Sequence, residues 1–501
     1  MERYEIAVAP FNWDDAVQWD GPGAIAGSEE SLSADRLDRA RYAEFLTNYL
    51  AAEGKQRNYV LNLNAEWGAG KTWFIKRWYM ELKAHYPTVY IDAWQQDFSD
   101  DPLLTVISSI IEQLKAEAGS PQLSPYLSTK LASLLKATAP IVTKALFKKV
   151  SGINIDEVQE VITADDAGKL VESLFQDTRK KTEAVQLLKH EIKQWVEAII
   201  GKKKKQAPAF ILIDELDRCR PSYAVEMLET IKHIFDIPKV VFVLATDTEQ
   251  LQHAVKVIYG ADFDAHTYLS RFFSRRFSLL AGSKRNFIES NLSNSVLVDH
   301  SFDKAWPKGL NLESLATVLS SISDACQLSL RSTEKLIDRI TLVLLNIERD
   351  DVNIVFLVYL LALHEIKPSD YEVIITMARS RQKLANVKMQ EIKPKALNEL
   401  QGSIYISMKA IQGVEFVAGY YSIKVESLIR DYLWSYLGEH DNASVKLLGQ
   451  NKTLIDQHSR FTRDEHNEAL KYYILNAELY EKSRLDMSVY RNWVELAMSF
   501  D

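Results

Sequence analysis

The chain has 501 residues, of which 47% are hydrophobic and 26% are charged, and its formal net charge is −8. This length exceeds what one hydrophobic core holds, and the ordinary composition excludes a mainly disordered, collagen-like or coiled-coil chain. The acidic balance argues against a protein that coats nucleic acid along its whole surface. Only two cysteines are present, Cys219 and Cys326, which excludes a disulfide scaffold and indicates a reducing compartment.

No segment has the pattern of a targeting signal or a membrane span. The chain begins with acidic residues where a signal peptide needs a basic and then an apolar stretch. The longest purely apolar run, Ile354–Leu363, has ten residues. Because roughly 20 residues are needed to cross a bilayer, this run predicts a buried helix. We therefore expect a cytoplasmic protein without a membrane span.

The N-terminal residues 1–32 are rich in Gly, Asp and Ser and predict an arm, with Trp13 and Trp19 as its anchors on the body of the protein. From Ser33 to Leu50 apolar residues recur near helical spacing, and Ser33 suits a helix N-cap. We expect the folded core to begin here and to extend to residue 280.

Within this core, strand patterns alternate with helical ones, which favours an α/β fold with a parallel sheet. Residues 99–205 have a helical pattern and predict an insertion that divides the core into two halves. The expected strands are Tyr59–Asn64, Thr88–Ile91, Ala209–Ile213 and Lys239–Ala245, and the clearest helices are Lys71–His85 and Leu103–Leu114.

The C-terminal part of the chain has no strong strand signal beyond Leu280, so we expect an all-α region. We divide it into a helical lid at 281–365 and a helical partner or assembly domain at 366–501. Amphipathic helices are expected around Tyr420–Tyr436 and Glu468–Tyr480. No catalytic constellation is visible there, which points to a separate protein as any effector.

The segment Ala65–Thr72 fits the phosphate-binding pattern GxxxxGK[ST], with Ala65 in place of the first glycine. It lies between an expected strand and an amphipathic helix. Glycines there let backbone N–H groups turn toward a phosphate, and the helix adds its N-terminal dipole. Lys71 is expected to reach the β- and γ-phosphates, and Thr72 to offer its hydroxyl to Mg²⁺. The expected nucleotide contacts are Gly68, Ala69, Gly70, Lys71 and Thr72.

The second half of the expected site follows the apolar strand Ala209–Ile213. Asp214 and Glu215 come at the carboxyl end of this strand, where α/β sheets bind ligands. We expect Asp214 to belong to the Mg²⁺ shell and Glu215 to polarise an attacking water. By themselves, acidic residues after a strand commonly mark only a solvated strand end. The lysine-bearing loop upstream favours a functional role for Asp214 and Glu215 at one site with that loop. For Asp217 and Arg218, a place near the nucleotide and a salt-bridged helix cap stay equally open.

Further candidates follow the strand that ends near Ala245. Thr246 and Asp247 are expected to sense the γ-phosphate, although Asp247 equally suits a helix N-cap. Arg271 and Arg275 are spaced to share a helix face, either as fingers on a neighbouring subunit's nucleotide or as a solvated basic face. Arg331, at the start of a later helix, is expected to reach back to the γ-phosphate and couple it to the lid.

The basic run Lys202–Lys205 suits a phosphate backbone, but a solvated loop is the favoured interpretation. The basic run therefore permits contact with nucleic acid, but the sequence does not favour it.

Together these motifs resemble the KAP family of P-loop NTPases. The resemblance extends from about Ser33 to about Ile340, and it implies an ATP-binding fold related to AAA+ and STAND proteins, with a long insertion between the two motifs. Many relatives carry transmembrane helices in that insertion, whereas lysines and a proline interrupt 131–150 here. The matching segments are Ala65–Thr72, Ile91–Trp94, Asp101–Pro102, Ile213–Cys219, Phe242–Asp247, Tyr268–Phe272 and Leu328–Arg331.

The expected function is Mg²⁺-dependent ATP binding and hydrolysis that controls assembly, as a homo-oligomer, or partner binding. The resemblance implies a bacterial or phage-encoded role in antiviral defence, which is an analogy because a fold does not determine its use. Two alternatives stay open: a nucleotide-stabilised scaffold with little turnover, and a nucleic-acid-stimulated ATPase.

Overall fold

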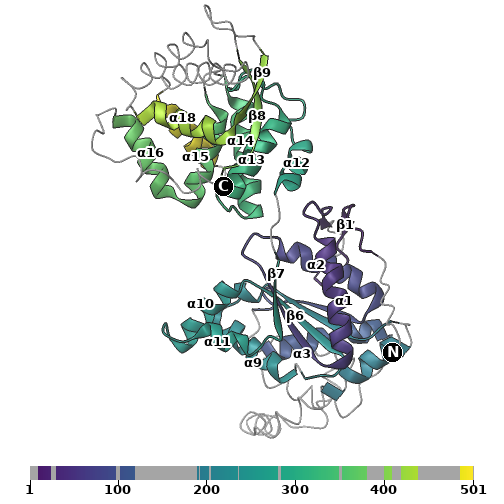
Figure 1. Cartoon of the computed structure of the whole chain (residues 1–501). Helices are drawn as coiled ribbons and strands as arrows, with labels where there is room; N and C mark the ends of the chain where they lie inside the picture. The colour runs from purple at the N-terminus through teal and green to yellow at the C-terminus, as the bar shows by residue number, and fades with distance from the viewer. Residues whose placement is uncertain are drawn as a thin grey trace, which may run out of the picture. The chain divides into compact units, whose positions relative to one another are not determined.

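The computed structural model describes residues 10–23, 30–97, 102–118, 189–190, 192–201, 205–234, 236–279, 284–348, 352–380, 400–408, 419–437 and 486–499. The chain forms two compact units, residues 1–280 and 281–501 (Figure 1). Each unit has its own buried apolar core.

The N-terminal unit is built on a five-stranded parallel sheet in the order β4–β5–β6–β3–β7. The predicted α/β fold with a parallel sheet is thus confirmed. Strands β5 and β6 are buried along their whole length, as is typical of parallel sheets covered on both faces. The strands are β3 (Tyr59–Asn64), β4 (Thr88–Asp92), β5 (Ala209–Asp214), β6 (Val240–Thr246) and β7 (Arg275–Ser278).

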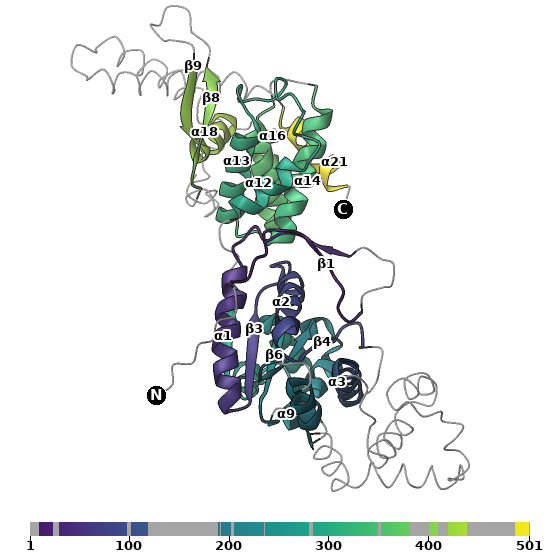
Figure 2. The same ribbon diagram turned by 90° about the vertical axis from the view of Figure 1, so that its right-hand side faces the viewer.

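Alternation along the strands assigns the helices to the two faces of the sheet. Tyr59, Leu61 and Leu63 pack in one cluster with α1 (Ala40–Gln56) and α2 (Lys71–His85). The opposite face packs against α3 (Pro102–Ala118), α9 (Pro221–Ile234) and α10 (Thr248–Tyr259), and α3 and α9 lie side by side (Figure 2). The polar residues that follow the strands are therefore left at the carboxyl edge.

Strands β4 and β5 are neighbours in the sheet although residues 93–208 lie between them in the chain. Within that stretch, α3 and the helical residues 192–201 contribute to the core beside the sheet. Most of the predicted insertion, residues 119–188, lies outside the described residues.

Two local predictions in this unit are wrong. The helix expected to start after Ser33 begins only at Ala40. The carboxylate of Asp35 accepts the N–H groups of Arg39 and Ala40, which holds residues 35–39 in a turn before the helix. Arg271 and Arg275 do not share a helix face: α11 (Ala265–Ser270) ends before Arg271, and Arg275 is the first residue of the edge strand β7.

The N-terminal arm packs on α2, and its short strands β1 (Val17–Gln18) and β2 (Ser31–Leu32) pair antiparallel. Trp13 is buried against Trp73 and Phe74 of α2, and Trp19 is buried against Tyr79. The two tryptophans are thus anchors, as the sequence predicts.

The C-terminal unit is helical, as predicted, and residues from both 281–365 and 366–501 share one core. The apolar run forms the buried helix α15. None of the helices in the described ranges is both long and apolar enough to cross a membrane. The helices are α12 (Arg285–Ser293), α13 (Leu312–Ala325), α14 (Leu330–Asn346), α15 (Ile354–Ile366), α16 (Pro368–Ser380), α18 (Val425–Leu437) and α21 (Met487–Met498).

This unit also contains a hairpin that the sequence did not predict, formed by β8 (Ser403–Met408) and β9 (Gly419–Lys424). The helix expected at Tyr420–Tyr436 therefore begins only at Val425. The helix expected at Glu468–Tyr480 lies outside the described residues.

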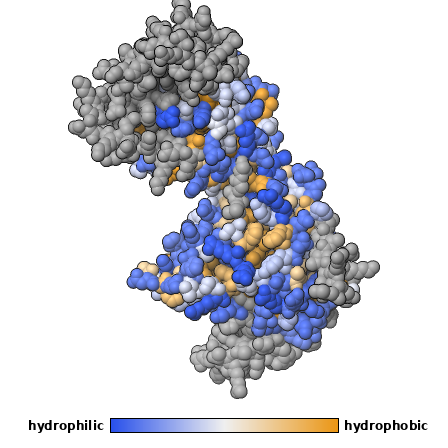
Figure 3. All heavy atoms as spheres, in the orientation of Figure 1, coloured by the Kyte–Doolittle hydropathy of each residue, from blue (hydrophilic) through white to orange (hydrophobic). Residues whose placement is uncertain are grey.

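The visible surface of the described residues is mostly hydrophilic, with apolar side chains in the middle of the visible face of the N-terminal unit and a smaller group at the tip formed by α10 and α11 (Figure 3). The exposed apolar residues of α10 are Val257, Ile258 and Tyr259.

Candidate nucleotide-binding site

A phosphate-binding loop connects the end of β3 at Asn64 to the start of α2 at Lys71. Gly68 and Gly70 have φ values of 76° and 78°, a left-handed conformation that glycine adopts without steric cost. Gly70 occupies the N-cap of α2, so the loop presents backbone N–H groups at a helix N-terminus. This is the local geometry that binds phosphate in P-loop proteins.

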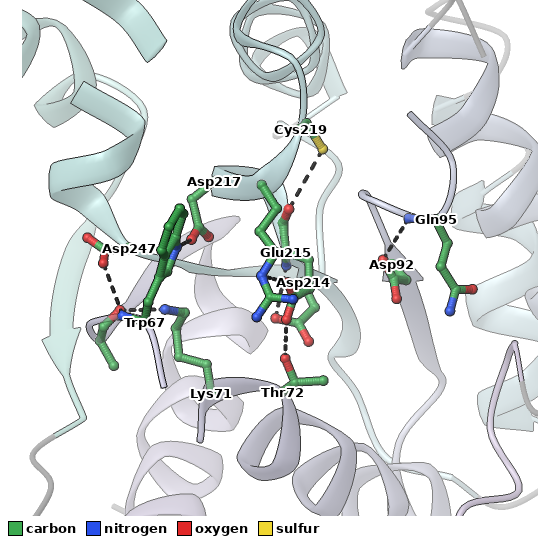
Figure 4. A network of polar contacts seen from close by, with 12 residues as sticks. Trp67, Lys71, Thr72, Asp92, Gln95, Asp214, Glu215, Asp217, Cys219 and Asp247 are labelled. Carbon is green, nitrogen blue, oxygen red and sulfur yellow. Dashed lines mark hydrogen bonds and ion pairs between the residues drawn. The ribbon is translucent and has the colours of Figure 1, made fainter. Parts of the chain in front are cut away.

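Lys71 folds over its own loop (Figure 4). The side chain is buried, and Nζ donates to the carbonyl oxygens of Ala65 at 2.5 Å and Glu66 at 3.2 Å. Both partners are neutral carbonyls, so a phosphate would offer the ammonium stronger, charge-assisted hydrogen bonds. The lysine is therefore held next to the loop by contacts that an anionic ligand can replace.

The acidic half of the site lies at the carboxyl end of β5. Asp214 is fully buried, accepts the Glu215 N–H at 3.0 Å, and accepts the Tyr90 hydroxyl at 3.3 Å. Burial, with smaller contributions from the nearby Glu215 and Asp92 carboxylates, raises the pKa of Asp214 to about 8. Glu215 has φ 63° and ψ 22°, a left-handed conformation that is uncommon for a residue with a side chain.

The two halves contact each other directly. The Thr72 hydroxyl of α2 donates to Glu215 Oε1, although 143 residues separate the two in the chain. Figure 4 shows Lys71 and Thr72 on one side of this contact and Asp214 and Glu215 on the other. The fold thus brings together the residues that the two sequence motifs place at one site.

These oxygen donors fit a hard divalent cation. A hydroxyl and a buried carboxylate, beside further carboxylates that raise its pKa, form a donor set that gains from a nearby positive charge. Within the described part of the chain, no three His, Cys, Asp or Glu side chains gather around a common point. Mg²⁺ does not require such a cage, because at nucleotide sites it takes one or two protein ligands and completes its shell with phosphate oxygens and water.

Asp217 and Arg218 also contact the site. Arg218 Nε forms an ion pair with Glu215 Oε2, and its guanidinium lies 5.7 Å from the ring centroid of Trp94. Asp217 accepts the indole N–H of Trp67, from the phosphate-binding loop, at 2.6 Å. Because Glu215 is the N-cap of the short 3-10 helix Leu216–Arg218, its ion pair with Arg218 is the salt-bridged cap that the sequence left open. A place near the nucleotide stays a prediction for both residues.

The end of β6 is tied to the same loop. Asp247 caps α10 by accepting the N–H groups of Glu249 and Gln250, and its other oxygen accepts the Trp67 N–H at 3.2 Å. Thr246 is buried and accepts a hydrogen bond from Asn62 at 3.2 Å. Asp247 therefore is the predicted N-cap and also contacts the phosphate-binding loop.

The two predicted arginines of the N-terminal unit do not join this cluster. In β7, Arg275 pairs with Leu61, three residues before the end of β3, which places it about 10 Å along the strand from the loop. Arg271 is the exposed C-cap of α11. Arg331 is exposed on α14 in the C-terminal unit. The finger and lid-coupling roles of these residues stay predictions.

The basic run before β5 is partly described. Lys205 forms an ion pair with Glu117 and donates to the Lys83 carbonyl oxygen at 2.5 Å, so this lysine is engaged within the unit. Lys202–Lys204 lie outside the described residues.

Sequence reasoning missed one buried cation beside the loop. Arg39 donates to the carbonyl oxygens of Ala69 at 2.7 Å and Gly70 at 3.3 Å. Its sequence context, an amphipathic segment rich in arginine and aspartate, is typical of a solvated helix surface, so no local signal marks it. Tyr90, which donates to Asp214, was also missed, because within the apolar strand pattern Thr88–Ile91 it is typical of a core residue.

Comparison with known proteins identifies the same region. Residues 39–346 match the family model described as the KAP family P-loop domain. The phage T7 exclusion protein of Escherichia coli (strain K12) is 23% identical over 272 residues, which cover 52% of this chain and 35% of that protein. The chain therefore spans about a third of the length of this relative. The solved structure of C. elegans PCH-2 aligns with 66% of this chain and 71% of that chain, at 13% identity and a TM-score of 0.29.

Proposed function

The chain belongs to the KAP family of P-loop domains, and from this premise we propose that it binds and hydrolyses ATP in a Mg²⁺-dependent reaction. The observation that carries the proposal is the contact between the Thr72 hydroxyl and Glu215. It joins a phosphate-binding loop to a buried acidic pair at the carboxyl edge of a parallel sheet, which is where α/β proteins bind ligands.

In the proposed reaction, water attacks the γ-phosphate in line with the leaving group. Loop N–H groups and the Lys71 ammonium hold the phosphates and offset their charge. The Glu215 carboxylate orients the water and accepts its proton. Thr72 and Asp214 are the residues that would hold the metal. When bound, Mg²⁺ supplies charge neutralisation on the phosphate oxygens.

Two contacts of Glu215 must change before it can act on water. One carboxylate oxygen accepts the Thr72 hydroxyl, and the other is paired with Arg218. A Thr72 hydroxyl that turns toward a cation leaves Glu215 with one partner fewer. We infer that nucleotide binding and the release of Glu215 are coupled through Thr72.

The first test is Lys71→Ala, with Lys83→Ala as the matched control. Both lysines lie on α2, but Lys83 pairs with Asp20 of the arm, away from the loop. We expect Lys71→Ala to lower ATP hydrolysis by about 100-fold or more, because it removes the cation at the developing phosphate charge. Phosphate release and calorimetric binding of Mg-ATP measure the effect. Equal activity in wild type and Lys71→Ala contradicts the proposal.

The proposed biological role is antiphage defence in the cytoplasm, supported by the similarity to a phage T7 exclusion protein. We propose that nucleotide state controls assembly of a homo-oligomer or docking of a separate effector, with the C-terminal helical unit as the responding part. Protection of cells against phage by the wild-type chain, lost on Lys71→Ala, tests this role.

A second candidate is a scaffold that nucleotide stabilises with little turnover. The engagement of Glu215 by both Thr72 and Arg218 favours it, because a water-orienting base held by two partners is unavailable to water. Such a protein would melt at a higher temperature with Mg-ATP and release no phosphate. Stimulation of hydrolysis by DNA or RNA, with a steep salt dependence, would instead support the nucleic-acid alternative.

A further inference from the structure

We propose that Arg39 is a positioning residue that fixes the phosphate-binding loop from behind and thereby sets its affinity for nucleotide. This inference rests on the proposed function. Arg39 precedes α1, which covers the sheet face beside β3, and it comes to the loop only through the fold.

The contacts of Arg39 are specific to the loop. The side chain is almost fully buried, with 1% of its surface exposed. One guanidinium nitrogen donates to the Ala69 carbonyl oxygen at 2.7 Å and another to the Gly70 carbonyl oxygen at 3.3 Å. A planar fork of donors suits two successive carbonyls in a way that a lysine ammonium does not.

These two carbonyls determine where the next two N–H groups point. A trans peptide is planar, so the carbonyl of one residue and the N–H of the next point in opposite directions. Holding Ala69 O toward Arg39 therefore directs the Gly70 N–H away from it. Gly70 O also accepts the Phe74 N–H of α2 at 3.0 Å, so Arg39 and the first turn of the helix together direct the Lys71 N–H. These are the N–H groups at the start of α2, on the side expected to receive the phosphates.

The cost of burying this cation also points to a role. Its guanidinium donates to neutral carbonyls, and among the described residues its buried Nε has no hydrogen-bond partner. Burial lowers the pKa of Arg39 to about 10, an effect that nearby Asp35 opposes. A guanidinium behind a loop that binds anions adds attraction for phosphate, and its hydrogen bonds polarise the peptide groups that donate to the ligand.

The arm holds Arg39 in place. Asp35 accepts the Arg39 backbone N–H, and the Asp35 N–H donates to the Trp13 carbonyl oxygen at 2.7 Å. Trp13 in turn packs on Trp73 and Phe74 of α2. The arm, the residue before α1 and the loop thus form one connected rear support.

The test compares Arg39→Lys with Arg77→Lys in the full chain. Arg77 is a matched control for the direct loop contact, since it is also buried, donates to an arm carbonyl, that of Asp15, and lies over the Trp13 ring at 5.4 Å, without contacting the loop. Calorimetry with Mg-ADP gives the affinity, steady-state ATP hydrolysis gives KM and kcat, and melting without nucleotide gives stability. We expect Arg39→Lys to weaken Mg-ADP binding by about ten-fold or more and Arg77→Lys by less than about three-fold.

A purely structural role would lower the melting temperature in both variants and the affinity in neither. An affinity for Mg-ADP in Arg39→Lys equal to that in Arg77→Lys overturns the inference and leaves the proposed function intact. If the wild type itself does not bind Mg-ADP, both this inference and the proposed function fail. If Arg39→Lys does not fold, Arg39→Gln replaces it, because a neutral amide is less costly to bury than an ammonium, and the same comparison applies.

Discussion

The two sides of the phosphate-binding loop differ in how their polar groups are partnered. On the side that faces Asp214 and Glu215, which we call the exchanging side, a nucleotide or a cation can replace the present hydrogen-bond partners. The Ala65 carbonyl that accepts from Lys71 is one such partner, and the Thr72 hydroxyl that donates to Glu215 is another. Behind the loop, Arg39 binds main-chain carbonyls and is enclosed by the core. The difference is consistent with the proposed division of labour, in which the side of Asp214 and Glu215 exchanges partners during hydrolysis and Arg39 holds the loop backbone still.

Uncommon backbone conformations occur on both sides of the loop. Glu215 is left-handed at the acidic pair with φ 63°, and Asp38, the residue before Arg39 in the rear support, has φ 54°. Uncommon conformations persist where the surrounding structure determines them. Here the parallel strands β5 and β6 and the rear support provide that rigid surrounding.

The largest expected effect comes from removing the rear anchor with Trp13→Ala. Trp13 is 1% exposed, and loss of a buried tryptophan costs about 3–5 kcal/mol of unfolding free energy. We expect the N-terminal unit to unfold at lower urea concentration and Mg-ADP binding to weaken as well. Fluorescence-monitored urea titration and calorimetry measure the two effects.

Trp94→Ala is the control, because Trp94 is 54% exposed and its loss should change stability by about 0.5 kcal/mol or less. A Trp13→Ala variant that is less stable but binds Mg-ADP with unchanged affinity would show that the rear support does not act on the loop.

A smaller effect is expected from Arg218→Met on the exchanging side. Arg218 is about one third exposed, so its ion pair with Glu215 is worth about 1 kcal/mol at most. Releasing Glu215 should raise the basal rate of ATP hydrolysis by about two- to five-fold. Steady-state phosphate release at saturating Mg-ATP measures the change.

Arg220→Met is the matched control, since Arg220 lies two residues after Arg218 and pairs with Asp97 rather than with Glu215. A fall in the hydrolysis rate of more than about ten-fold in Arg218→Met would mean that Arg218 acts on the phosphates and does not restrain Glu215.

The sequence was sufficient to predict the elements that carry the two motifs. Strand β3, helix α2 and strand β5 lie where apolar patterning and β-propensity put them, because each is long and strongly patterned. The pairing of Thr72 with Glu215 also follows from patterns, since both come at the carboxyl edge of a parallel sheet.

Other features had no local signal. Strand β7 has four residues, two of them arginines, and it is a strand only because β3 offers an unpaired edge. The hairpin β8–β9 also depends on pairing across the chain. Arg39 is in a segment that reads as a helix surface, and only the arm and the loop around it make it a buried residue. Long-range partners decide each of these features.

The central claim is that loop and acidic pair form one hydrolytic site, and Glu215→Gln tests it most directly. The substitution keeps the shape of the side chain and removes its ability to accept a proton. We predict an unchanged affinity for Mg-ATP and a rate of phosphate release lower by about 100- to 1,000-fold, within the range of general-base contributions. Glu249→Gln, on the exposed start of α10, should match the wild type in both. Equal rates of phosphate release in wild type and Glu215→Gln would contradict the account.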